Sequence, residues 1–391
     1  MPPPTRPGPA PSVPLPGAAP GEGDDLTGDR PRSQWADQVE TAAFRPVAAV
    51  VGQTSYGGGG SSACLVSDGR CVSVADVEAI GGCPGSSAAD FWFVLGAGLE
   101  GRELTSRLAE AFRSEFGDRC AVVRSKDLLM AVRGGRLALS DLDGCELAAP
   151  KAAYARVWTP AVRTDREITL LRHLEAMGTL LLNPVDAVLA CLNKFWHLQQ
   201  LAVAGLPVPD TWTYADAPLA DAIRAGAPQP CVVKAVRGHR GEQVFLAPHR
   251  AMLQGIQGSL SQDGPYLFQE YLEYSYGRDL RVIVVDGRAV AAQVRTAPDG
   301  EFRSNLALGG TACVCTGRYP QGEALAVRAA EVLGLRVAGV DLLFAPGGGF
   351  TLCEVNANVG WRAAMPGVTP AIVAACRSRL GAAPQEVPAA W

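Results

Sequence analysis

Apolar residues follow two different spacings in the part of the chain that begins near residue 89. Short continuous runs have the length and composition of buried strands, while longer stretches repeat apolar residues every three or four positions, as one face of a helix does. The expected strands are 89–95, 121–124 and 153–158, and the expected helices are 101–116 and 167–177. The segment 127–139 contains a Gly-Gly turn and fits a helix end or a hairpin. This alternation predicts a small parallel α/β domain over residues 89–182.

The pattern changes near Asn183. Asparagine is a good N-cap and Pro184 suits the first helical position, so we expect one long helix that ends at Gly205. The further strands expected are 231–236, 243–246, 266–272, 280–285, 289–295, 337–345 and 350–355, and the further helices are 324–333 and 370–380. The Asp-Gly pair at 286–287 is a strong signal for a hairpin turn. These elements predict an α+β domain over residues 183–381, followed by a tail at 382–391.

The first 88 residues show no such periodicity. They are rich in Pro, Gly, Ala and Ser, and the start of the chain, Met1-Pro-Pro-Pro, leads into a stretch with almost no aromatic residues. Such a composition cannot bury enough apolar surface to offset the entropy of ordering, so we expect a disordered extension over residues 1–88. Its short apolar runs after residue 36 predict no fold of their own.

Charge and cysteine content narrow the function classes. The net charge is −4 and the pI is near 5.7, so no broad basic face is expected for non-specific nucleic-acid binding. No apolar run of 18 residues predicts a membrane span, and no basic segment followed by an apolar one predicts a secretory signal. The 11 cysteines form no C-x-x-C pair and are expected to be reduced. We therefore expect a cytoplasmic protein.

Two strand-like runs around a Pro-Gly-Gly-Gly turn carry three oxygen ligands. If the hairpin is symmetrical about its glycines, Asp341 lies opposite Glu354, and Asn356 returns to the same face two residues later. Two carboxylates and an amide oxygen suit Mg²⁺. The alternative, acidic residues on a solvated face, is disfavoured because the neighbouring residues are largely apolar.

Two lysines are candidates for binding phosphate. Lys234 stands inside an apolar strand, where a charge is costly unless it is paired. A basic loop bracketed by glycines follows at 237–241, and glycines let backbone amides approach a phosphate closely. The alternative for Lys234 is an edge-strand lysine that reaches solvent. Lys194, on the helix expected after Asn183, fits a surface position equally well.

Three arginines are candidates for binding a phosphoryl group or a carboxylate substrate. Arg281 and Arg295 lie on the two arms of the hairpin with the Asp-Gly turn, near one another but not clearly paired, and Arg303 follows the second arm. Guanidinium groups near a metal site suit a transferring phosphoryl group and a carboxylate substrate. The alternative is that these arginines only form salt bridges with Asp279 and Asp299.

With these residues identified, the chain resembles the ATP-grasp carboxylate–amine ligases, specifically the RimK-like glutamate ligases, over about residues 91–380. The segments that carry the resemblance are Asn193-Lys194-Phe195-Trp196, Val232-Val233-Lys234 with Arg237-Gly238-His239-Arg240-Gly241, Phe268-Gln269-Glu270-Tyr271 with Gly277-Arg278-Asp279-Leu280-Arg281, Phe302-Arg303-Ser304-Asn305 with Gly309-Gly310, and Val340-Asp341 with Glu354-Val355-Asn356-Ala357-Asn358. The first two are most similar to the animal branch, which includes N-acetylaspartylglutamate synthase and β-citrylglutamate synthase. The last two look more like the bacterial branch, which adds glutamates to the C-terminus of ribosomal protein S6.

The resemblance implies an ATP-grasp fold, in which two α+β subdomains clasp ATP behind a small parallel α/β domain. It also implies roles for individual residues. Those implied to bind ATP are Lys194, Lys234, Gly238, Gly241, Arg295, Asp279 or Glu273, and the hinge Gln269, Glu270, Tyr271 and Leu272, whose backbone would contact adenine. Asp341, Glu354 and Asn356 are implied to hold about two Mg²⁺ or Mn²⁺ ions. Arg281, Arg303 and Asn305 are implied to face the acyl phosphate or the substrate carboxylates.

The implied activity is ATP-dependent joining of L-glutamate to N-acetylaspartate or citrate through an acyl phosphate, with release of ADP and phosphate. One alternative is a protein glutamate ligase that uses the same chemistry on a polypeptide C-terminus. Another is a non-catalytic nucleotide-binding scaffold, which the intact set of lysines and carboxylates disfavours. Family members often assemble, so a homo-oligomer is possible, and neither nucleic acid nor membrane is expected as a partner.

Overall fold

The structure is a computed structural model that describes residues 89–157, 166–238, 241, 243–258, 260 and 265–381. The extension expected at 1–88, the tail expected at 382–391, and His239 and Arg240 of the basic loop lie outside the described residues. Within the described residues, no helix combines the length and the apolar character needed to cross a membrane.

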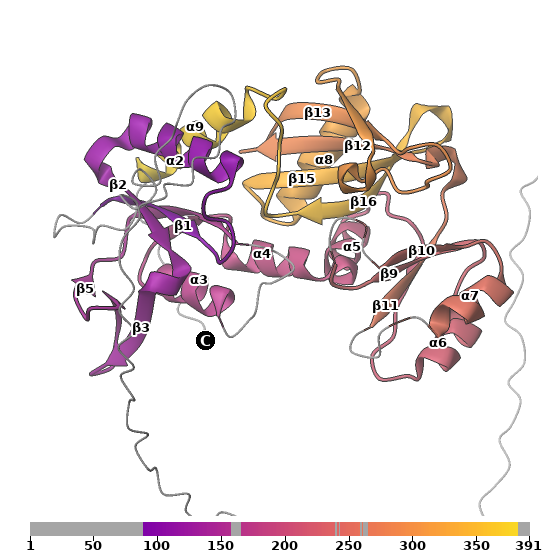
Figure 1. The fold of residues 1–391 in the computed structure, drawn as a ribbon, viewed down its shortest axis with the longest axis horizontal. Coiled ribbons are helices and arrows are strands. Elements are labelled where there is room, and N and C mark those ends of the chain that lie inside the picture. Colours follow the sequence, from indigo (N-terminus) through magenta and orange to yellow (C-terminus); the bar gives the residue numbers. More distant parts are fainter. Residues whose placement is uncertain are drawn as a thin grey trace, which may run out of the picture. The chain divides into compact units, whose positions relative to one another are not determined.

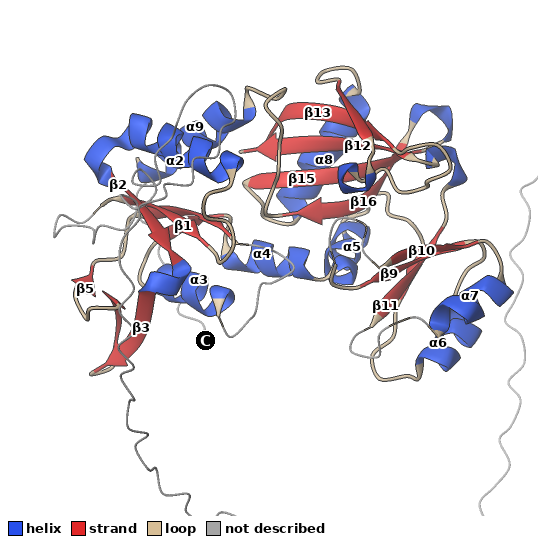
Figure 2. Ribbon diagram, in the orientation of Figure 1, coloured by secondary structure: helices blue, strands red, loops and turns tan. Residues whose placement is uncertain are grey.

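A four-stranded parallel sheet comes first in the described chain (Figures 1 and 2). Its elements are β1 (Phe91–Leu95), β2 (Cys120–Arg124), β6 (Ala152–Arg156) and β7 (Leu180–Leu182), with α2 (Glu103–Phe116) and α3 (Glu167–Ala176) between the strands. The strand order β2-β1-β6-β7 places β1 at the centre. Phe112 of α2 packs against the rings of Phe91, Phe93 and Tyr154 on the sheet. The predicted parallel α/β arrangement is therefore confirmed.

The segment that fitted either a helix end or a hairpin is a hairpin. Strands β3 (Leu128–Arg133) and β4 (Arg136–Asp141) pair in an antiparallel manner, and β5 (Glu146–Leu147) extends them to a three-stranded sheet. The Gly-Gly turn joins β3 to β4. Both glycines have positive φ angles, which glycine adopts without steric cost.

A five-stranded antiparallel sheet carries most of the predicted site. Its strands are β12 (Arg278–Val285), β13 (Arg288–Thr296), β14 (Thr311–Val314), β15 (Val337–Phe344) and β16 (Phe350–Asn356), in the order β14-β13-β12-β15-β16. Helix α8 (Pro320–Val332) packs on one face. Helix α9 (Val368–Leu380) contacts β12, β13 and β6, and so joins this sheet to the parallel sheet through one apolar cluster.

A second antiparallel sheet carries Lys234. Its strands are β8 (Thr211–Trp212), β9 (Cys231–Ala235), β10 (Val244–Ala247) and β11 (Tyr266–Glu270), in the order β10-β9-β11-β8. Helices α6 (Leu219–Gly226) and α7 (Arg250–Gln257) lie beside this sheet (Figure 2). Their residues Ile223 and Leu253 are buried in its apolar cluster. The strand expected to run to residue 272 ends at Glu270.

The prediction of one long helix after Asn183 is wrong. The structure has two helices, α4 (Val185–Leu192) and α5 (Lys194–Val203), because Asn193 turns the chain and caps α5 by accepting from the Phe195 and Trp196 amides. Apolar residues continue at helical spacing across this break, so the periodicity could not reveal it.

Asn183 does not cap α4, contrary to the prediction, and Pro184 precedes the helix. The Asn183 side chain is buried and makes four hydrogen bonds to backbone distant in sequence. Its Oδ1 accepts from the Arg336 and Val337 amides, both at 2.7 Å, and its Nδ2 donates to the carbonyls of Val337 and Ala357 at 2.8 and 3.1 Å. This side chain therefore fastens the end of β7 to β15.

The register predicted for the β15–β16 hairpin is confirmed at the predicted ligands. Asp341 pairs with Glu354, and Gly339 pairs with Asn356. The hairpin is not fully symmetrical, because Leu342 pairs with Leu352 and leaves Cys353 as the extra residue of a β-bulge.

Candidate active site

Two adjoining cavities bring the predicted site residues together. The smaller has a volume of about 140 Å³ and the larger about 720 Å³. Both are lined by Lys194, Gly238, Arg295, Asn305, Asp341 and Glu354. The smaller cavity adds Lys234, Gly241, Gln269, Glu270, Tyr271, Leu272, Asp279 and Arg303, and the larger adds Arg281 and Asn356. Of the residues predicted to belong to the site, only Glu273, the alternative to Asp279, lines neither of the two cavities.

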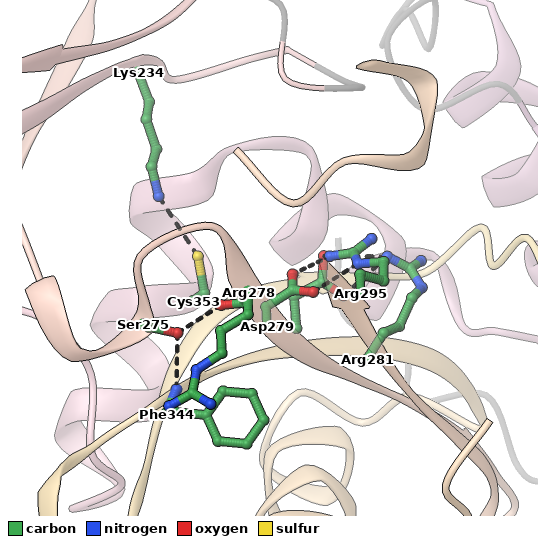
Figure 3. A network of polar contacts seen from close by, with 9 residues as sticks. Lys234, Ser275, Arg278, Asp279, Arg281, Arg295, Phe344 and Cys353 are labelled. Carbon is green, nitrogen blue, oxygen red and sulfur yellow. Dashed lines mark hydrogen bonds and ion pairs between the residues drawn. The ribbon is translucent and has the colours of Figure 1, made fainter. Parts of the chain in front are cut away.

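Lys234 is held at a defined position in the smaller cavity. Its Nζ donates to Gln269 Oε1 at 2.7 Å. It also donates to Cys353 Sγ at 3.5 Å, and Figure 3 draws this second contact. Gln269 is itself fixed, since its Nε2 donates to the Thr211 hydroxyl. The lysine therefore lies in the cavity with neutral partners, and its charge stays available to an anionic ligand.

Lys194 lies where the two cavities meet, rather than at a surface position. Its side chain is 12% exposed, and its Nζ donates to the Gly238 carbonyl at 2.9 Å and lies 3.7 Å from Glu354 Oε1. The break between α4 and α5 produces this placement, since the Lys194 amide also donates to the carbonyl of Val236. Helix α5 thus directs Lys194 toward the basic loop that follows β9.

A buried histidine, His197, lies near Lys194 and Lys234. His197, on α5, is fully buried, and neither of its ring nitrogens has a hydrogen-bond partner among the described residues. Burial, with the charges of Lys194 and Lys234, lowers the pKa of His197 to about 3. Burial and the two lysines all disfavour the protonated ring, so the imidazole is neutral.

Two arginines, Arg281 and Arg295, bind Asp341. Figure 3 shows the side chains of these arginines near one another. Arg281 Nη1 donates to Asp341 Oδ1 at 2.9 Å, and Arg295 Nη2 lies 2.9 Å from Asp341 Oδ2. Arg295 also forms a two-point contact with Asp279, its partner in the β12–β13 ladder. The Asp279 contact expected as an alternative is therefore present, but the arginines also bind a predicted metal ligand and line the cavities.

Burial and charge act in opposite directions on these carboxyl groups. Burial raises the pKa of Asp341, but Arg281 and Arg295 outweigh it and hold that pKa below its usual value. Asp341 is thus ionised although it is buried. Burial raises the pKa of Asp279, and Arg295 opposes that rise.

The chemistry of the donor set fits a hard divalent cation. Asp341 and Glu354 face one another across the β15–β16 ladder, and Asn356 joins them on the wall of the larger cavity. No group of three His, Cys, Asp or Glu side chains suited to a metal occurs among the described residues, so the amide of Asn356 is needed to complete the set. Oxygen ligands of this kind suit Mg²⁺ or Mn²⁺, with water and phosphate oxygens in the other positions.

Arg303 links two loops at the edge of the smaller cavity. Its guanidinium makes hydrogen bonds to both carboxylate oxygens of Glu301, at 3.0 and 2.7 Å, and Nη1 donates to the Gly241 carbonyl at 3.1 Å. A side chain at Gly241 would meet Asn305 Oδ1 at 2.9 Å, so glycine allows this close approach. The loop after β13 therefore contacts the Gly-rich loop after β9.

Ser275 fixes the start of β12 against the end of β15. Its hydroxyl donates to the Arg278 carbonyl and accepts from the Phe344 amide at 3.0 Å (Figure 3). The guanidinium of Arg278 in turn lies 4.7 Å from the centre of the Phe344 ring. These contacts position the segment between the expected hinge and Asp279.

Several residues that line the cavities were missed from the sequence. Arg156, Gln293 and Asn358 line the larger cavity, and Cys353 and Arg278 line the smaller one. Arg156 ends a strand that reads as ordinary parallel sheet, and Gln293 stands in an apolar run. Only the polar character of Gln293 inside that run could have drawn attention to it.

Comparisons with known proteins agree with this geometry. The family model described as the RimK-like ATP-grasp domain matches residues 191–369. Human β-citrylglutamate synthase B is 40% identical over 284 residues, 71% of this chain and 73% of the relative. Mouse N-acetylaspartylglutamate synthase A is 41% identical over 67% of this chain and 68% of the relative. A probable α-L-glutamate ligase of Legionella pneumophila is 40% identical over 49% of this chain and 63% of the relative.

Solved structures support the fold. D-cycloserine synthetase DcsG superimposes with a TM-score of 0.58 at 20% identity, covering 74% of this chain and 99% of that chain. The ATP-grasp ligase PsnB, solved with Mg and ADP, gives a TM-score of 0.53 at 21% identity, covering 75% of this chain and 99% of that chain. The ATP-grasp fold class predicted from the sequence is therefore confirmed.

Proposed function

The chain belongs to the RimK-like ATP-grasp ligases, which form carbon–nitrogen bonds, and on that premise we propose that it joins L-glutamate to N-acetylaspartate or citrate. A carboxylate does not react with an amine unaided. Transfer of the γ-phosphoryl group of ATP to the carboxylate gives an acyl phosphate and ADP. The amine of glutamate then displaces phosphate, and a new amide bond results.

One observation carries this proposal: cationic side chains predominate around the larger cavity. They are Arg102, Arg156, Lys194, Arg237, Arg281, Arg295 and Arg362, against Glu103, Asp341 and Glu354. Arginine recognises planar carboxylates through paired hydrogen bonds, so such a lining suits substrates that carry several carboxylates. The two substrates of the proposed reaction, taken together, are of that kind.

The residues of the two cavities suit the phosphoryl transfer. Lys234 and Lys194 would contact the phosphates of ATP as point charges, and the segment Gln269–Leu272 would contact adenine. Arg281, Arg295 and Arg303 would neutralise the charge that develops on the transferred group. Asp341, Glu354 and Asn356 would hold Mg²⁺ or Mn²⁺, which supplies electrophilic activation of the phosphates when bound.

Water must be kept from an acyl phosphate, since hydrolysis wastes it. Arg303 and Gly241, which both line the smaller cavity, are joined by a hydrogen bond, and we expect this contact to limit the access of water. No nucleophilic side chain is required, because the substrate carboxylate is itself the nucleophile.

The test is ADP release by the purified protein with Mg²⁺, ATP and L-glutamate, offered N-acetylaspartate, citrate or a C-terminal peptide in turn. We expect one small acid to stimulate ADP release and a ligated product of matching mass. Lys234→Met serves as the inactive control. Stimulation by the peptide alone would replace the proposal with protein glutamate ligation, in line with the similarity to the Legionella ligase. Binding of ATP without any turnover would support a non-catalytic role.

A further inference from the structure

Strand β3 is an edge of the three-stranded sheet, and its side chains are unusually apolar for that position. Val132 is 71% exposed, Leu129 49% and Met130 37%, and Leu137, which pairs with Val132 from β4, is also exposed. Native proteins usually protect an edge strand with Lys, Pro or a bulge. The strand β3 contains neither Lys nor Pro, and the β3–β4 ladder has no bulge. This edge is therefore open to another strand.

The turn of this hairpin determines which backbone groups face the open edge. Gly134 and Gly135 form the whole turn, so the residues on either side of them, Arg133 and Arg136, make a hydrogen-bonded pair. Hydrogen-bonded and non-hydrogen-bonded pairs alternate along an antiparallel ladder. The even-numbered residues of β3 therefore point their amide and carbonyl groups away from β4. Among the described residues, no backbone hydrogen bond reaches these outward groups.

A second copy of β3 fits this edge. Two identical strands that pair in an antiparallel manner are related by a two-fold axis, and the outward groups of one must meet the outward groups of the other. Even-numbered residues then pair with even-numbered residues, so only every second register is possible. The two registers with the greatest overlap place the axis at Met130 or at Ala131. With the axis at Met130, Leu128 of each copy pairs with Val132 of the other.

Charge distinguishes these two registers. An axis at Met130 places Arg133 of each copy opposite Asp127 of the other, the residue just before β3, whereas an axis at Ala131 places it opposite Leu129. Arg133 is exposed and forms no ion pair with any described residue. The Asp127 side chain is 33% exposed and binds Arg124 through Oδ2, which leaves Oδ1 available. Opposite charges that face one another across a ladder stabilise it, so the register about Met130 is favoured.

We propose that two copies of this chain associate through β3, in antiparallel register about Met130, so that their three-stranded sheets form one continuous sheet. Each copy contributes the same strand, so the association is closed and removes both open edges at once. It also covers apolar side chains that the single chain exposes. The inference goes beyond the proposed activity and does not depend on it, since no residue of β3 lines either cavity.

The first test uses sedimentation velocity of the full-length protein over a series of concentrations, and compares Met130→Pro and Met130→Val with wild type. Proline removes the amide at the centre of the proposed pairing. It leaves the β3–β4 ladder intact, because that amide points away from β4, and edge strands tolerate proline at such positions. Valine keeps the amide and favours a strand, so Met130→Val is the matched control. Circular dichroism shows whether each variant is folded.

The second test examines the register by charge reversal. Arg133→Asp places two carboxylates opposite one another on each side of the axis, and Asp127→Arg places two guanidinium groups there. Either change alone should weaken association, because like charges that face one another across a ladder are unfavourable. The two changes combined in one chain restore opposite charges and should restore association, which a merely structural role of either residue would not do.

We expect wild type and Met130→Val to form dimers with similar Kd, and Met130→Pro to raise the Kd at least about tenfold. A wild type that stays monomeric at every concentration would overturn the inference, and so would a folded Met130→Pro that associates as tightly as wild type. If Met130→Pro does not fold, the charge reversals decide, and a combined variant that remains monomeric overturns the proposed register. Protection of the β3 amides from hydrogen exchange in a monomeric wild type would show that another segment occupies this edge, and would also overturn it.

Discussion

Asp341 lies directly opposite Glu354 in the β15–β16 ladder, yet the two carboxylates have very different surroundings. Asp341 is buried between two guanidinium groups, whereas Glu354 is 28% exposed and lies 3.7 Å from Lys194. Both are predicted metal ligands, but only Asp341 also has a structural task.

Asp341→Asn should therefore destabilise the protein much more than Glu354→Gln, whereas both variants should be inactive. Asp341→Asn leaves two buried arginines without their shared counter-ion, so we expect the free energy of unfolding to fall by about 3–5 kcal/mol. Glu354→Gln removes one partly exposed pair and should change it by no more than about 1 kcal/mol. Both should lose Mg²⁺-dependent ADP release. Urea unfolding gives the first quantity, and equal destabilisation of the two variants would contradict the distinction.

Gly339→Ala should reduce activity without unfolding the protein. A methyl group at Gly339 would lie 2.7 Å from Arg281 Nη2, so the guanidinium must move away from Asp341. Because the displaced atom is the end of a flexible side chain, we expect a change of less than about 1 kcal/mol in stability and roughly a tenfold loss of turnover. The control is Gly255→Ala in α7, where a methyl group meets no atom within 4 Å. Full activity in Gly339→Ala would show that the position of Arg281 is unimportant.

The pair Glu301–Arg303 gives a pH-dependent contribution to stability. Hydrogen bonds from Arg303 lower the pKa of Glu301 to about 2 from its usual 4.5. Between these values the unfolded chain binds more protons than the folded one, so stability rises with pH. The difference in stability between wild type and Glu301→Gln should be greatest above pH 4.5 and should vanish as the pH falls toward 2. Urea midpoints across this range give the answer, and a pH-independent difference would exclude the ion pair as its cause.

Asn183→Ala should destabilise the protein far more than Asn193→Ala. Removal of the Asn183 amide leaves four backbone groups without this partner, three of them in buried hydrogen bonds, and we expect a loss of about 3 kcal/mol or more. Asn193→Ala removes a helix cap, for which the expected loss is about 1 kcal/mol. Thermal unfolding of the two variants side by side tests this order, and a larger effect at Asn193 would refute it.

Local patterns were sufficient to predict those parts of the site that a single hairpin builds. The glycine turn and the period-2 alternation are enough to predict that Asp341 lies opposite Glu354. The Asp-Gly turn placed Arg281 near Arg295, and the structure shows them bound to the same carboxylate.

Features that depend on contacts between residues distant in sequence could not be predicted from local patterns. The break at Asn193 lies within a continuous apolar stripe. The turn is held by a hydrogen bond from the Lys194 amide to the carbonyl of Val236, which is distant in sequence. Arg156 acquires its surroundings from Val359, separated from it by 203 residues. An asparagine before a helix also looks the same in sequence whether it caps that helix or, as Asn183 does, binds another strand.

The bulge at Cys353 determines whether a thiol or a carboxylate lies opposite Asp341. Beyond the bulge a regular ladder would continue the pairing of Leu342 with Leu352, so Cys353 would be the partner of Asp341 and Glu354 would point to the opposite face. A thiolate there would favour soft metals such as zinc, whereas the carboxylate favours magnesium. Under the proposed metal assignment, the choice between a sulfur and an oxygen ligand opposite Asp341 therefore depends on a one-residue shift of the backbone register as well as on the identity of the side chains.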